Sequence, residues 1–336
     1  MADMVFFIGE VVGKWKLMAE NQWWSIFETA YFVKRGNCIM NKQVRADLML
    51  LGCTVFWGAS YLLTKLALRE LQAFNLTALR LLIGFVVSGA VFYKRILKSD
   101  IRTVKYAVIL AVIIVFMFLS MSYGLEYTTA SNAGFLISLA VIIIPILSYL
   151  FLRQRIEKRV LLGVCIAPIG IALLTLNEQL SINSGDLLCI LCALFSAMHV
   201  VCMGVFTQKV DSVALGILQL GFAGVFSLIF SFFTETVRLP VTGTAWGAIL
   251  GLAILCTAVG YLIQATAQQY TSATHTGLIL SLEPVFSAIF GFAFLGEILS
   301  VRGYVGAAVL MLSVLVAELD FKKKNIECEA AEEIEG

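Results

Sequence analysis

An acidic side chain, Glu283, stands inside an apolar segment and directly precedes Pro284. Proline removes one helical hydrogen bond and frees the carbonyl one turn back, here that of Leu280. Such a break supplies polar backbone groups that can line a cavity. A low-dielectric environment disfavours the charged form of a carboxyl group, so Glu283 could exchange protons or contact a substrate. The alternative is a structural carboxylate that bonds a neighbouring helix.

A second candidate feature is a stripe of side chains spaced by three or four residues and therefore on one helical face. It consists of Cys189, Cys192, Ser196, His199 and Met203. The stripe either faces a cavity, with His199 as a polar contact, or packs between helices. Cys-x-x-Cys with a histidine can bind a soft metal, but no fourth ligand accompanies it. We therefore predict no metal site and no cofactor.

Two further sets of side chains could contact a substrate. Trp57, Ser60 and Thr64 share one face, and an aromatic ring there offers cation–π contacts to an amine. Gln264 and Gln268 are four residues apart, and their amides must find partners in other helices or in a substrate. Helix packing is the alternative for both sets.

Arg80 lies only a few residues inside an apolar segment. We expect a structural role for it. Its side chain could extend to the outer membrane interface or pair with a carboxylate such as Glu126.

The composition requires a membrane. Of 336 residues, 60% are hydrophobic and 14% charged, and the mean hydropathy is +0.93. No soluble domain buries that much apolar surface. The net charge of +2 is spread over loops, which argues against nucleic-acid binding. The eight cysteines lie mostly in apolar segments and are expected to be structural thiols.

Apolar runs long enough to cross a bilayer recur along the chain, and in lipid they must be helices. We predict an all-α membrane protein whose short loops make neighbouring helices antiparallel. The ten expected spans are 48–66, 75–93, 104–124, 130–151, 160–177, 185–206, 213–233, 245–268, 273–295 and 302–319.

Basic residues set the orientation of these spans. With the segment before the first span inside, the inner segments and tail carry 15 Lys and Arg residues and the outer loops carry four. An excess of basic residues marks the cytoplasmic side. Both ends of the bundle are therefore expected in the cytoplasm.

The chain contains an internal repeat. Residues 127–163 align without a gap with residues 270–306, and 11 of 37 positions are identical. Nearer the start of each unit, Asp47 matches Asp186 and Arg80 matches Gln219 at a shift of 139 residues. Five spans per unit is an odd number, so the two copies must be inverted. Duplicated hydrophobic units are typical of secondary transporters, whose site lies where the repeats meet.

Residues 1–46 form an N-terminal extension without the pattern of a signal peptide. Its tryptophans could form an interfacial helix, but we favour Met40 as the start, because it leads directly into the first span. Residues 321–336 are expected to be a charged, disordered cytoplasmic tail.

Several motifs together resemble the EamA family of the drug/metabolite transporter superfamily. They are Phe56-Trp57-Gly58 in the first span, Tyr127-Thr-Thr-Ala-Ser-Asn-Ala, Ser281-Leu-Glu-Pro-Val-Phe-Ser, and Leu295-Gly-Glu297. The resemblance implies two EamA repeats, 47–177 and 183–320, and a central cavity lined by spans one, three, four, six, eight and nine.

The candidate cavity residues also include Tyr123, Asn132 and Tyr261, which lie in spans three, four and eight. The first repeat departs from the family pattern, since Ala140-Val141 replaces the Glu-Pro pair. A proline occurs one turn later, so we expect helix breaks at Pro145 and Pro284.

The leading hypothesis is a secondary transporter in the inner membrane that exports an amino acid or related metabolite by alternating access, with protons as a candidate coupling ion. The alternative is uptake or exchange of a metabolite or a drug-like cation. A membrane-embedded enzyme is a remote alternative, because no His-Glu-x-x-His or Gly-x-Ser-x-Gly motif occurs. We therefore predict that the protein is not an enzyme.

The orientation is testable with reporter fusions. The charge asymmetry predicts an outside signal for a reporter fused at residue 240 and an inside signal at residue 98. The opposite pattern would contradict the topology.

Overall fold

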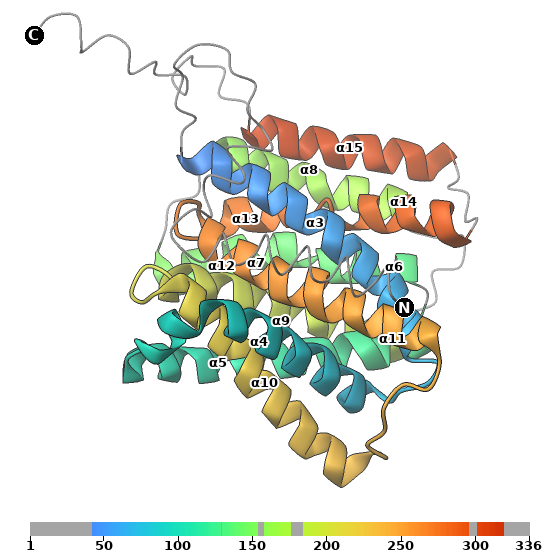
Figure 1. Cartoon of the computed structure of the whole chain (residues 1–336). Helices are drawn as coiled ribbons and strands as arrows, with labels where there is room; N and C mark the ends of the chain where they lie inside the picture. The colour runs from blue at the N-terminus through green and yellow to red at the C-terminus, as the bar shows by residue number, and fades with distance from the viewer. Residues whose placement is uncertain (1–41, 129, 154–157, 176–183, 296–300, 319–336) are drawn as a thin grey trace, which may run out of the picture.

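The computed structural model describes residues 42–128, 130–153, 158–175, 184–295 and 301–318, and the regular structure in these ranges is helical (Figure 1). The predictions for the N-terminal extension and the C-terminal tail lie outside the described residues. The helices are α3 (Lys42–Ala67), α4 (Ala73–Leu97), α5 (Ile101–Tyr127), α6 (Ala130–Ser138), α7 (Ala140–Leu152), α8 (Lys158–Thr175), α9 (Ser184–Phe206), α10 (Ser212–Thr234), α11 (Gly243–Gly251), the π-helix η1 (Leu252–Val259), α12 (Gly260–Ala267), α13 (Ala273–Leu280), α14 (Glu283–Leu295) and α15 (Val301–Glu318).

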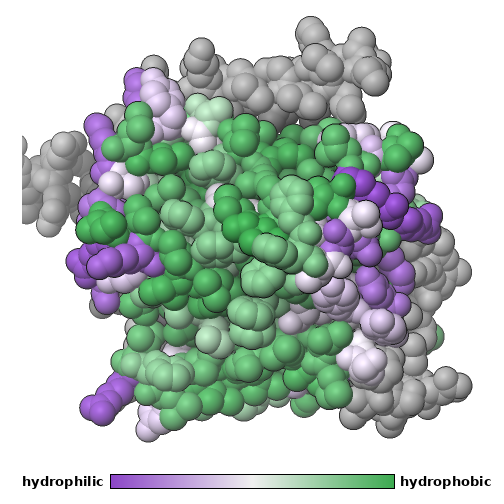
Figure 2. Space-filling model, turned by 90° about the horizontal axis from the view of Figure 1, so that it is seen from below, coloured by the Kyte–Doolittle hydropathy of each residue, from purple (hydrophilic) through white to green (hydrophobic). Residues whose placement is uncertain are grey.

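The chain is a multi-pass membrane protein. Seven helical segments are long and apolar enough to span a bilayer, among them α3, α5 and α9. Figure 2 shows the matching surface, a broad apolar face between two hydrophilic margins. Helices occur within each of the ten ranges expected from the sequence, although three of these ranges, those of α6–α7, α8 and α15, are not among the seven.

The two halves of the chain are interleaved. Helix α4 packs along α10, α5 along α9, and α8 along α15. Helix α3 packs against α14, η1 and α12. Each pairing joins a helix that ends at or before Thr175 to one that begins at or after Ser184 (Figure 1). The space between the helices is therefore bounded by both halves.

Two spans are broken at equivalent positions. Helix α6 gives way to α7 at Leu139, and α13 gives way to α14 at Ser281 and Leu282. The second break precedes Pro284 as predicted. The prediction of a break at Pro145 was wrong, because this proline lies within α7 and the break comes six residues earlier. The carbonyl that Pro145 leaves without a helical donor is that of Val141, which lies inside α7, so this proline does not account for the break at Leu139.

The end of the bundle at which α3 ends, here called the distal end, is held by two carboxylates. Glu235 accepts hydrogen bonds from the backbone N–H groups of Phe74 (2.9 Å) and Asn75 (2.8 Å), which cap the start of α4. Glu70 accepts from the hydroxyl and the N–H of Thr242. The Thr242 hydroxyl is the main reason that the pKa of Glu70 lies below its usual value, so this contact persists into mildly acidic solution.

The opposite, proximal end is held by a different set of contacts. Asp211 caps α10 through the N–H of Ala214 at 2.7 Å and pairs with Arg95 at 3.2 Å. The Gln208 amide donates to the carbonyl of Gln269 at 2.9 Å. Both distal contacts and the proximal Arg95–Asp211 pair thus join the two halves, whereas the Gln208–Gln269 contact lies within the second half.

The packing of α3 on α14 depends on Gly58. A Cβ atom at this position would lie 2.6 Å from the Cβ of Phe286 and 2.9 Å from the backbone nitrogen of Ser287. We expect Gly58→Val to destabilise the fold by about 1–3 kcal/mol through overpacking. Gly52→Val on the same helix is the control, since nothing lies within 4 Å of its added Cβ. Thermal unfolding of the purified variants measures the difference, and equal melting temperatures would contradict this close contact.

Candidate functional site

A cavity lies where the two halves meet. Its empty volume, with the open mouth included, is about 740 Å³. Side chains from α3, α5, α6, α7, α9, α12, α13 and α14 line it, and these belong to the spans implied by the family resemblance. Helix α4 also contributes one side chain, Arg80, which the sequence did not predict.

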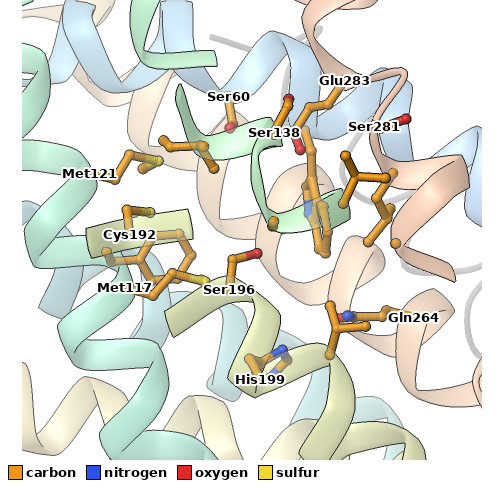
Figure 3. A pocket seen from close by; sticks show the side chains of 18 of the residues that line it. Ser60, Met117, Met121, Ser138, Cys192, Ser196, His199, Gln264, Ser281 and Glu283 are labelled. Carbon is orange, nitrogen blue, oxygen red and sulfur yellow. The ribbon is translucent and has the colours of Figure 1, made fainter. Parts of the chain in front are cut away.

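One end of the cavity contains the carboxyl group of Glu283. Figure 3 shows Glu283 beside Ser60 and Ser138, which come from α3 and α6. Tyr61 of α3 also lines the cavity. Glu283 is the first residue of α14, because the break at Ser281 and Leu282 ends the preceding helix. A helix N-terminus favours negative charge, whereas burial opposes it.

The other end of the cavity is formed by neutral polar groups. Ser196, His199 and Gln264 lie together there in Figure 3. His199 Nε2 lies 3.0 Å from Gln219 Oε1, so this nitrogen is the donor when that oxygen accepts. The imidazole also packs edge-on against Tyr261, with ring centroids 5.5 Å apart. These contacts hold the imidazole in one orientation.

Aromatic rings form the wall between the two ends. The Trp57 indole N–H donates to the carbonyl of Cys256 at 2.8 Å. Cys256 belongs to the π-helix η1, an irregularity that often marks functional sites. The indole also lies against Gly260, where a Cβ would come within 2.6 Å of Trp57 Nε1. Tyr261 follows at a centroid distance of 5.5 Å from Trp57, so the wall is tightly packed.

The sequence suggested that Arg80 extends to the membrane interface or pairs with Glu126. The structure shows neither arrangement. The Arg80 side chain is 2% exposed and lines the cavity, while Glu126 is exposed. Arg80 Nε donates to Thr257 Oγ1 at 3.1 Å, and the guanidinium carbon lies 4.1 Å from the Phe118 ring centroid. The hydroxyl and the aromatic ring stabilise the buried cation. The internal match of Arg80 to Gln219, which is also buried, was a usable signal.

The structure brings most of the predicted residues together. Those that line the cavity are Trp57, Ser60, Ser196, His199, Tyr261, Gln264 and Glu283. Three others do not line it. The Gln268 amide donates to the Val200 carbonyl at 2.9 Å, Thr64 is buried in α3, and the Tyr123 hydroxyl lies 3.5 Å from Glu235 at the distal end. The Asn132 side chain lies outside the described residues.

Several lining residues were missed by the sequence argument. Phe118, Met121 and Ser138 are the internal-repeat equivalents of Tyr261, Gln264 and Ser281, at a shift of 143 residues, and all six line the cavity. The repeat itself therefore contained the signal for them. Among the described residues, no group of three or more His, Cys, Asp or Glu side chains is arranged to hold a metal ion.

Comparisons with known proteins agree with this architecture. The family model described as "EamA-like transporter family" matches residues 44–176 and 183–318. An uncharacterized transporter of Archaeoglobus fulgidus is 29% identical over 292 residues, which cover 87% of this chain and 92% of that protein. The uncharacterized transporter YetK of Bacillus subtilis is 25% identical over 319 residues, covering 90% and 95%.

The fold also matches a solved structure. A protein crystal structure aligns with a TM-score of 0.69 over 82% of this chain and 96% of that one. The sequence identity is 18%, so this likeness concerns the fold alone.

Proposed function

Because the chain belongs to the EamA-like transporter family, we propose that it is a secondary-active transporter that exports a small metabolite, an amino acid or a related compound, across the inner membrane. The observation that carries the proposal is the cavity, which both halves line and which contains Glu283 beside a helix break. Transporter sites are expected at this place, between repeats and next to discontinuous helices. We also propose that the protein is not an enzyme.

The proposal includes ten spans in two inverted repeats, 47–177 and 183–320, with both ends of the bundle in the cytoplasm. The contacts between the halves support this arrangement, because equivalent helices of the two repeats make equivalent contacts with the opposite repeat. Helix α3 of the first half packs on α12 and α14 of the second, while α9 packs on α5 and α7. The matching breaks at Leu139 and Leu282 give further support, as does the charge asymmetry, which assigns the proximal end to the cytoplasm.

Alternating access requires contacts that open in turn at each end of the cavity. Asp47 of α3 lies 3.6 Å from His275 of α13 at the proximal end. Its internal-repeat equivalent, Asp186 of α9, accepts a hydrogen bond from Thr128 at 3.0 Å near the start of α6. In each case an aspartate of one half contacts the beginning of the broken span of the other. We propose that the two contacts open alternately as one repeat rocks against the other.

Glu283 is the proposed coupling group. It lines the cavity as the first residue of α14, where the helix N-terminus favours a negative charge and low-dielectric surroundings oppose it. A group under such opposing influences can exchange a proton when a substrate amine arrives or leaves. Uptake or exchange of a drug-like cation is the second candidate, because aromatic rings beside a carboxylate also suit an amine.

The coupling role of Glu283 is testable by two substitutions. We expect Glu283→Gln to abolish or strongly weaken transport while the protein still inserts and purifies as a folded species, because glutamine keeps the size of the side chain but cannot ionise. Transport in proteoliposomes between pH 5 and 8, together with thermal unfolding, measures both properties.

Glu283→Ala separates the functional role from a structural one. A structural carboxylate would tolerate glutamine and lose folding with alanine, since each buried partner left unpaired costs about 1–3 kcal/mol. A coupling carboxylate loses transport in both variants. Full transport by Glu283→Gln across this pH range would rule out the coupling role.

A further inference from the structure

We infer that Arg80 is a carboxylate-binding subsite, so that the exported compound is an amphipathic molecule with a carboxylate group. This inference rests on the proposed transport function and narrows its substrate class. It begins from one unusual feature, a guanidinium group that is buried in a membrane protein, lines the cavity and has no acidic partner among the described residues.

The charge of Arg80 is not neutralised by the part of the chain that the structure describes. No carboxylate of the described residues lies within 4.0 Å of its nitrogen atoms. Nη1 is buried and has no hydrogen-bond partner among these residues. Buried charges in membrane proteins face a cavity and are paired, and an unpaired buried ion is strongly destabilising. A bound anion would supply the missing partner.

The guanidinium group is held in a fixed position with one edge unused. Nε is bound by the Thr257 hydroxyl at 3.1 Å, and the Phe118 ring lies 4.1 Å from the guanidinium carbon. These two contacts leave the Nη1 edge without a protein partner. A guanidinium edge presents parallel N–H donors that match the two oxygens of a carboxylate.

The rest of the cavity indicates the kind of anion. Its walls include Trp57, Met117 and Tyr261, which suit an apolar body. Arg80 is the single Lys or Arg among the described lining residues, and its repeat equivalent, Gln219, is already bonded to His199. A single cation fits a monoanion better than a phosphate dianion. Glu283 at one end of the cavity would repel a second negative charge and accept an amine.

The same feature argues against a drug-like cation. A cation without an acidic group would have to enter a cavity that already contains an uncompensated guanidinium. Like charges that meet at low dielectric are a strong means of rejecting the wrong ligand. The carboxylate subsite therefore also distinguishes the two transport hypotheses.

The first experiment uses the free metabolites of cells that overexpress the full chain. Mass spectrometry of the medium compares the wild type with Arg80→Gln, Arg80→Lys and the control Arg102→Gln, which removes an exposed cation at the start of α5. We expect the compounds enriched by the wild type to carry a carboxylate. Arg80→Gln should reduce their export about 10- to 100-fold, the loss of a hydrogen bond to a charged group. Export by Arg80→Lys should lie between that of the wild type and that of Arg80→Gln, and export by Arg102→Gln should equal that of the wild type.

The second experiment separates recognition from a structural role. The binding of an enriched compound and of its amide is compared in the purified wild type and in Arg80→Gln. The wild type should prefer the carboxylate about 10- to 100-fold, and the variant should bind the two forms equally. Should Arg80→Gln not fold, Thr257→Val frees Nε while keeping the charge and should weaken the same preference. A merely structural arginine would leave the preference unchanged.

The outcomes distinguish this inference from the proposed function. No enrichment by the wild type would overturn the proposed export and this inference with it. Enriched compounds without a carboxylate, or an unchanged carboxylate preference in Arg80→Gln or Thr257→Val, would overturn the carboxylate subsite alone.

Discussion

The architecture depends on one constraint, that lipid offers no partner for a backbone hydrogen-bonding group. Irregular backbone within a membrane protein is tolerated only where protein or a water-filled cavity surrounds it. The breaks at Leu139 and at Ser281–Leu282 and the π-helix η1 all adjoin helices that line the cavity. The irregular segments thus place the start of α14 at the cavity and orient its wall, since the carbonyl of Cys256 in η1 accepts the indole N–H of Trp57.

The two halves share a backbone plan but differ in chemistry. Glu283 corresponds to Ala140, Arg80 to Gln219 and Ser60 to His199 under the internal alignment. Duplication supplies two equivalent broken spans, and substitution has left one carboxyl group and one guanidinium group among the described residues that line the shared cavity. A site with one acidic and one basic group matches a compound that carries both charges, whereas two identical halves would have repeated a single charge.

Much of this structure could be predicted from the sequence. Hydropathy located the helices, because a bilayer demands long apolar segments. The motifs identified the EamA family, and the family match confirms this. The position of Glu283 beside a break followed from the adjacent proline. These features are local in the chain, so the sequence reveals them directly.

The features that were missed depend on distant contacts. Leu139 has ordinary helical dihedral angles (φ −58°, ψ −15°), so no residue preference marks the first break, and Pro145 gave a misleading local signal. Arg80 lies near the end of a span, where extension to the interface is the local expectation. Its partners, Phe118 and Thr257, come from other helices, and Thr257 follows 177 residues later. Comparison of the two repeats, which pairs Arg80 with the buried Gln219, would have corrected the prediction for Arg80.

The central claim is that one cavity between the interleaved halves opens to each side of the membrane in turn. A single cysteine in place of Ser60 or Ser196, at opposite ends of this cavity (Figure 3), tests it most directly once the eight native cysteines are replaced. Membrane-impermeant thiol reagents are then applied to either face of oriented vesicles. Alternating access predicts that each cysteine is labelled from both faces, and that a reagent bound from one face blocks labelling from the other. Labelling from one face only, at both positions, would contradict the account.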